Sequence, residues 1–85
     1  MKSAYELAME RLGGPVIQLS EEQKAAIAEV DKRRKAKIAE AELARDRRIA
    51  AKPEDAHQIQ QEFRIETASI EERAERDKEK IRNAS

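Results

Sequence analysis

The sequence contains no cysteine and no tryptophan, and aromatic residues make up only 2% of its 85 residues. Without cysteine, the chain forms neither a disulfide framework nor a thiolate nucleophile or zinc–thiolate site. The only glycines, Gly13 and Gly14, are adjacent, so the sequence offers no glycine-rich phosphate-binding loop. No serine has a histidine close by in the sequence to act as its base. We therefore expect a protein that is not an enzyme and has no cofactor.

Long apolar runs are missing too. No stretch approaches the roughly 18 apolar residues that mark a membrane span. The first residues lack the basic segment and following apolar stretch that are typical of a signal peptide. These features predict a soluble, cytoplasmic protein without a membrane partner.

Charge is what the sequence has in abundance. Charged residues make up 42% of the chain, and their formal sum is zero. Residues 24–52 hold ten Lys/Arg against five Asp/Glu, whereas residues 53–85 hold six against nine. Such a composition is typical of a long solvated helix or of a disordered chain. If both segments are helical, their opposite charges make them suitable neighbours.

A regular spacing of isoleucine favours helix over disorder. Isoleucine recurs every eleven residues in two runs, which are Ile27, Ile38 and Ile49, then Ile59, Ile70 and Ile81. Eleven residues make three helical turns, so the members of each run share one helix face. The step between the runs is ten residues and contains Pro53. The pattern therefore predicts two helices joined by a turn.

The expected organisation has three parts. We predict a short N-terminal helix within residues 1–14, a linker over 15–19, and a helical hairpin over 20–85. The hairpin helices are expected at about 21–51 and 54–82. Their similar length and tight connection predict an all-α, antiparallel arrangement.

Local signals support these boundaries. Ser20 and Gln23 have the spacing of a capping box, in which each side chain bonds the other residue's backbone N–H. Ser3 and Glu6 repeat this spacing at the start of the chain. Pro53 is suited to the first position of a helix.

The two isoleucine runs also fix how the helices pair. Ile49 with Ile59, Ile38 with Ile70, and Ile27 with Ile81 have positions that add up to 108. Folding the chain about Glu54 stacks them as three layers of a coiled coil with an eleven-residue (hendecad) phase. We call the residues predicted between the helices the seam: Ile27, Val30, Ile38, Ala41, Ile49, Ile59, Phe63, Ile70, Ala74 and Ile81.

The same register predicts contacts for charged residues. It places Arg45 beside Phe63, and long basic side chains can lay their aliphatic stems along the seam. At the seam's edges it predicts that Arg33 meets Glu75 and that Lys37 meets Glu71.

A second set of apolar residues is left without a partner by this pairing. We expect them to form a partner or oligomer surface, and they are Tyr5, Met9, Leu12, Ala36 and Leu43. Two helices bury little apolar surface, and chains of this size commonly gain stability by association. We expect a homo-oligomer, with a dimer that forms a four-helix bundle favoured, and a protein partner for the N-terminal helix.

Two alternatives rest on charged residues. Nucleic-acid or ribosome contact would use the basic residues Lys32, Arg33, Lys35, Lys37, Arg47 and Arg48. The zero net charge and the lack of an aromatic platform make nucleic acid the less favoured partner. A metal-binding bundle is a remote alternative, because Glu54 and His57 have the Glu-x-x-His spacing of di-iron carboxylate proteins. An exposed histidine in the first turn is the favoured interpretation.

The segment Lys2-Ser3-Ala4-Tyr5-Glu6-Leu7-Ala8-Met9-Glu10-Arg11-Leu12 resembles the opening of a group of short bacterial proteins without assigned function. The resemblance continues through Leu19–Lys24 to about residue 42. It implies a bacterial, cytosolic, coiled-coil-like protein, and it implies no activity, cofactor or site residue.

Overall fold

The computed structural model describes Ala4 and residues 19–84. Within these residues 94% are helical and none lies in a strand, which confirms the all-α class. The expected N-terminal helix and linker, and with them Tyr5, Met9 and Leu12, lie outside the described residues apart from Ala4 and Leu19.

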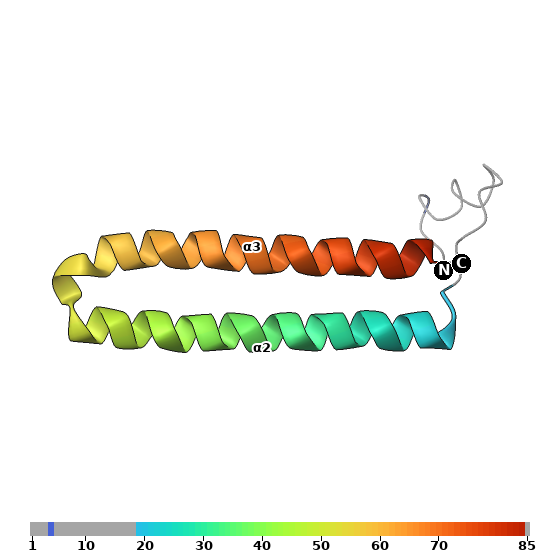
Figure 1. Cartoon of the computed structure of the whole chain (residues 1–85), viewed down its shortest axis with the longest axis horizontal. Coiled ribbons are helices and arrows are strands. Elements are labelled where there is room, and N and C mark those ends of the chain that lie inside the picture. Colours follow the sequence, from blue (N-terminus) through green and yellow to red (C-terminus); the bar gives the residue numbers. More distant parts are fainter. Residues whose placement is uncertain (1–3, 5–18, 85) are drawn as a thin grey trace.

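Two long helices form the described part of the chain. Helix α2 spans Glu21–Ala51, the single 3-10 turn η1 spans Pro53–Asp55, and helix α3 spans Ala56–Asn83. At 1.5 Å per residue, the 31 residues of α2 extend about 46 Å. The two helices lie side by side, with η1 at one end of the pair and Glu21 and Asn83 at the other (Figure 1).

The start of α2 confirms the predicted capping box. The Gln23 N–H donates to Ser20 Oγ at 3.1 Å, and the Ser20 N–H donates to Gln23 Oε1 at 2.8 Å. Both bonds satisfy backbone donors that a helix leaves unpaired at its start. Glu21 and Glu22 follow in the first turn, where acidic groups complement the helix dipole.

The connection between the helices is a 3-10 turn. The Lys52 N–H donates to Arg48 O at 2.9 Å and ends α2, and the Asp55 N–H donates to Lys52 O at 3.0 Å. Pro53 begins the turn, where its missing N–H costs no hydrogen bond. The expected second helix began at about residue 54. The structure instead begins α3 at Ala56, after the turn has reversed the chain.

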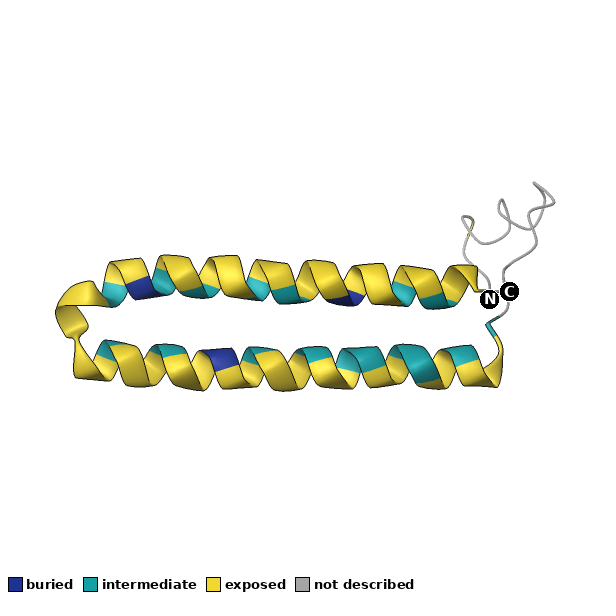
Figure 2. Ribbon diagram, viewed as in Figure 1, coloured by how far each residue is buried: buried dark blue, intermediate teal, exposed yellow. Residues whose placement is uncertain are grey.

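The core is a narrow strip between the helices. Ala41, Ile59 and Ala74 are buried, and no side chain in the described residues is fully enclosed. Buried and half-buried residues line the facing sides of α2 and α3, while exposed residues cover the rest (Figure 2). Two of the three buried residues are alanines, because small side chains lie closest to the opposite backbone. The core is therefore one seam, open to solvent along its flanks.

Candidate functional site

The structure places all ten seam residues at buried or half-buried positions. On α2, inward residues are spaced by three and four from Gln23 to Ile49, and α3 continues the pattern from Ala56 to Ile81. This alternation keeps one face of each helix toward the other over its whole length. Thr67 lies half-buried between the seam residues Phe63 and Ile70. Its hydroxyl donates to the Phe63 carbonyl at 3.0 Å, so it needs no hydrogen-bond partner on α2.

One level of the seam combines a cation with the phenyl ring of Phe63. The Arg45 guanidinium carbon lies 4.3 Å from the centre of the Phe63 ring. At this distance the positive charge interacts favourably with the ring face. Arg45 also donates to Asp46 at 3.0 Å. The contact that the register predicts between Arg45 and Phe63 is therefore present, with the charged group bonded at the surface.

A network of charged side chains crosses the seam between the level of Ile27 and Ile81 and the level of Ile38 and Ile70. Lys78 Nζ lies 3.1 Å from Asp31 Oδ1 and 2.9 Å from Glu75 Oε1, with 12% of its side chain exposed. Arg34 lies 3.0 Å from Glu71 and 3.4 Å from Asp31. Five side chains thus link the two helices on one flank of the seam.

The predicted ion pairs of Arg33 with Glu75 and of Lys37 with Glu71 are wrong. Arg33 instead pairs with Glu29 in its own helix at 3.5 Å. The partners of Glu75 and Glu71 are Lys78 and Arg34. Arg34 reaches Glu71 across the seam, whereas Lys78 pairs with Glu75 of its own helix. Arg34 and Lys78 are half-buried between the helices, whereas Arg33 and Lys37 are exposed.

The network shifts the pKa values of Asp31, Glu75 and Lys78. The hydrogen bond from Lys78 is the main cause that lowers the pKa of Asp31, and it likewise lowers the pKa of Glu75. Near the turn, the Arg48–Glu62 bond of 2.7 Å lowers the pKa of Glu62. Glu75, followed by Asp31, raises the pKa of Lys78 above its ordinary value.

These shifts predict a loss of stability in acid. A carboxyl group whose pKa is lowered by folding stabilises the folded state at pH values above its ordinary pKa, which is 3.8 for Asp31 and 4.5 for Glu62 and Glu75. This contribution is lost as the pH falls below the ordinary pKa and through the lowered pKa of the folded state. The Lys78 contribution is present below 10.5 and is lost above it. We expect a lower Tm by circular dichroism at about pH 3 than at about pH 7. Lys78→Gln should reduce this difference, and a Tm that does not fall in acid would contradict the prediction.

Gln23 has a second role that the sequence pattern did not predict. Its Nε2 donates to Ile81 O at 2.9 Å and to Ala84 O at 2.8 Å. One side-chain amide therefore accepts a backbone N–H at the start of α2 and donates to two backbone carbonyls at the end of α3, where helix carbonyls run out of partners within the helix. The Ile81 carbonyl also accepts the Ala84 N–H at 3.3 Å. In the sequence, only the predicted register indicates this contact, because it places Gln23 level with the last residues of α3.

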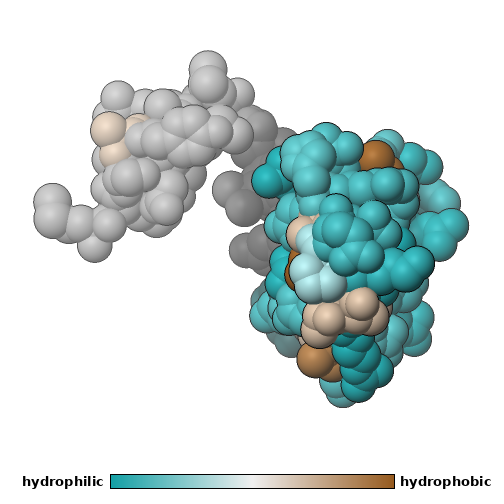
Figure 3. Space-filling model, turned by 90° about the vertical axis from the view of Figure 1, so that its left-hand side faces the viewer, coloured by the Kyte–Doolittle hydropathy of each residue, from teal (hydrophilic) through white to brown (hydrophobic). Residues whose placement is uncertain are grey.

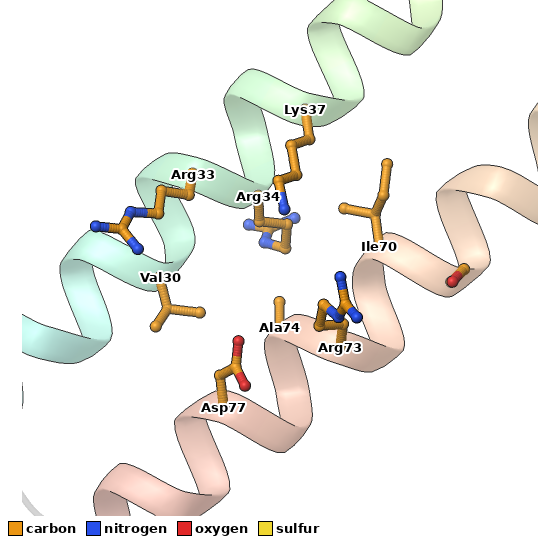
Figure 4. Close-up of a pocket in the computed structure, with 9 residues that line it drawn as sticks. Val30, Arg33, Arg34, Lys37, Ile70, Arg73, Ala74 and Asp77 are labelled. Atoms are coloured by element: carbon orange, nitrogen blue, oxygen red, sulfur yellow. The ribbon is translucent and has the colours of Figure 1, made fainter.

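The other flank of the seam is hollowed. A hollow of about 170 Å³ lies beside Val30 and Ala74, and Lys37 and Arg73 extend toward it from the two helices (Figure 4). This first hollow is smaller than the roughly 300–1,000 Å³ of small-molecule sites, whereas the hollow lined by Lys37, Glu40 and Ala41 measures about 350 Å³. This larger hollow and a third one continue the first along α2 and α3, through Lys37, Ala41 and Ala44 to the region of Arg48. We call these three hollows together the groove.

The six predicted nucleic-acid residues are all exposed but do not form one surface. Lys32, Lys35 and Arg47 line no part of the groove, whereas Arg33, Lys37 and Arg48 do. Consecutive residues on a helix are about 100° apart, which disperses a basic run around α2. The structure brings Arg33 and Lys37 near Arg73 of α3, a residue that was not among the candidates.

The remaining candidates are at the surface. Glu54 and His57 are exposed, and within residues 19–84 no three metal-binding side chains are grouped. Ala36 and Leu43 are exposed. Leu43, at 57% exposure, and Ile65 of α3, at 73%, are the large apolar side chains of the described residues that face solvent. Seen from the turn end, the surface is mainly hydrophilic with small separate hydrophobic patches (Figure 3).

In the part of the chain that the structure describes, neither long helix carries an apolar stretch sufficient to cross a membrane. Comparison with protein-family models, curated proteins and solved structures finds no match to this chain.

Proposed function

We propose that this protein is a non-enzymatic helical interaction protein, built as an antiparallel hairpin with hendecad phase, that associates with itself. A dimer that forms a four-helix bundle is the simplest assembly. Following the resemblance of its opening segment, we place it in the bacterial cytoplasm.

The observation that carries this proposal is the incomplete burial of the seam. Ile59 is the only large apolar side chain of the described residues that is buried, and the other five isoleucines of the two runs are half-buried. Apolar surface that two helices leave in contact with water is removed from it when a second pair of helices packs against them. Association therefore completes a core that one chain leaves open.

The N-terminal segment supplies the second part of the proposal. Tyr5, Met9 and Leu12 are spaced to share one helix face, and the seam does not need them. We propose that this segment either contacts a protein partner or covers the bundle of its own chain. A chain that lacks residues 1–14 distinguishes between these two roles.

Self-association predicts a Tm that depends on protein concentration. Raising the concentration about a hundredfold should raise the Tm by several degrees, because association stabilises the folded state by mass action. Circular dichroism melts of the full chain and of a chain lacking residues 1–14 measure this effect. A constant Tm for the full chain would contradict self-association. An unchanged Tm and mass after truncation would remove the covering role, and an unchanged pull-down would remove the partner role.

Nucleic-acid contact has less support. The six candidate basic residues of α2 point in several directions, and two of these six, Arg33 and Arg48, already have acidic partners within the chain. Phosphate contacts are strongest at low salt, so the absence of binding to generic DNA and RNA at about 50 mM salt is the expected result.

A further inference from the structure

The groove carries a charge pattern along its length. Its end near Ala74 is mainly basic, and the middle of the groove is acidic. The charged residues at that end are Arg33, Arg34, Lys37, Arg73 and a single acid, Asp77, and those in the middle are Glu40 and Glu66. Five charged residues that border the groove, Lys37, Glu40, Glu66, Arg73 and Asp77, make no ion pair with any residue within 19–84. The described chain thus presents two unpaired cations and three unpaired carboxylates on one flank, and Lys37, Glu40, Glu66 and Arg73 are the four that lie nearest the middle of the helix pair.

These four charges are arranged symmetrically about one level of the helix pair. Lys37 and Glu40 lie at equal distances on either side of the midpoint between residues 38 and 39. Arg73 and Glu66 lie at equal distances on either side of the midpoint between residues 69 and 70. In the register of positions that add up to 108, residues 38 and 39 face residues 70 and 69. Both midpoints are therefore at the same level.

Such an arrangement complements itself under a twofold rotation. Consider a second copy that faces the groove, and a twofold axis in the plane between the two copies. If this axis passes through the shared level and is perpendicular to the helices, α2 lies antiparallel to α2 of the second copy, and α3 lies antiparallel to α3 of the second copy. Lys37 then lies level with Glu40 of the second copy, and Arg73 lies level with Glu66 of the second copy. Each pair occurs twice, as a twofold interface requires.

We propose that the groove is the site where a second copy of this chain docks, about a twofold axis at the Ile38–Ile70 layer. The inference rests on the self-association proposed above and assigns its surface and geometry. Ala41, Ala44 and Ser69 border the groove and allow the second helix pair to come close. If the two hairpins instead pointed in the same direction, about a twofold axis parallel to the helices, Lys37 would lie against Arg73 of the second copy, and the two cations would repel each other.

The opposite flank is less suited to docking. There Asp31, Glu71 and Glu75 already bond Arg34 and Lys78. Arg34 also borders the groove, but none of these three acids does. The proposed axis also brings Asp77 level with Glu62 of the second copy. That carboxylate is neutralised by Arg48 at 2.7 Å, which limits the repulsion.

Two charge-reversed variants test the geometry. The first, Glu40→Lys with Glu66→Arg, makes the groove basic, and the second, Lys37→Glu with Arg73→Glu, makes it acidic. Each alone should raise the dissociation constant at least about tenfold, because like charges then face each other. Mixed in equal amounts, the two variants regain all four pairs and should associate as a heterodimer. Glu42→Lys is the matched control, since Glu42 is exposed on α2 and borders no part of the groove.

Light-scattering mass and helical circular dichroism are the readouts. The proposal expects about twice 9.7 kDa for the native chain, for Glu42→Lys and for the mixture, and values near 9.7 kDa for each reversed variant alone. If both reversed variants stay helical and dimeric, self-association is retained but the groove is not its surface. A monomeric native chain would instead overturn the proposed function itself. Oligothymidylate that binds the native chain and dissociates the dimer would identify a polyanion as the occupant and overturn the proposal.

Discussion

Replacement of Ile59 by alanine is expected to lower the free energy of unfolding by about 2–5 kcal/mol, since the substitution removes buried methyl groups and leaves a cavity. Ile59 has the lowest exposure of the described residues, at 4%, and the register predicts that it packs beside Ile49. In a chain of this size the loss corresponds to a fall in Tm of about 10 °C or more. Urea unfolding followed by circular dichroism measures it.

Ile65→Ala is the matched control for this variant. It makes the same chemical change in the same helix at a side chain that is 73% exposed. Surface substitutions of this kind usually change stability by less than about 0.5 kcal/mol. Equal losses for Ile59→Ala and Ile65→Ala would contradict the pairing of α2 with α3 through the seam.

Insertion of one alanine between Ile38 and Ala39 is expected to have the second large effect. One residue rotates the remainder of α2 by about 100°, so only one of its two halves can face α3. If the half nearer the turn is displaced, Ala41, Arg45 and Ile49 leave the seam. Full burial of an isoleucine or phenylalanine contributes about 1.5–3 kcal/mol, and several such contacts are weakened, so we expect a loss of at least about 3 kcal/mol.

The control is an alanine inserted between Lys52 and Pro53. This site lies between the helices, where an extra residue leaves the phase of both helices intact and adds little loop-closure entropy. Chemical unfolding of the two insertion variants compares them directly. Similar losses at both positions would show that stability does not depend on the eleven-residue phase.

The two isoleucine runs and Pro53 predict much of the fold because they constrain helix phase and chain reversal together. Eleven residues match three helical turns closely, so each run specifies a face without knowledge of its partner. The break of ten residues then places the turn. The Ser20–Gln23 capping box is equally local, because its hydrogen bonds involve only neighbouring backbone groups.

Features that depend on side-chain direction across the seam were not predictable in this way. The sequence places Arg33 and Glu75 at one level, but which cation reaches which acid depends on rotamers, and exposed alternatives differ little in energy. The charge symmetry of the groove could be predicted only with knowledge of which flank of each helix is open to solvent. It rests on Arg73 and Glu66, which belong to no recognisable motif.

The solution mass of the full chain, measured by light scattering over about a hundredfold range of concentration, tests self-association most directly. Self-association predicts a mass of about twice 9.7 kDa that declines toward 9.7 kDa only on dilution. A mass of 9.7 kDa at every concentration, with helical circular dichroism retained, would contradict it.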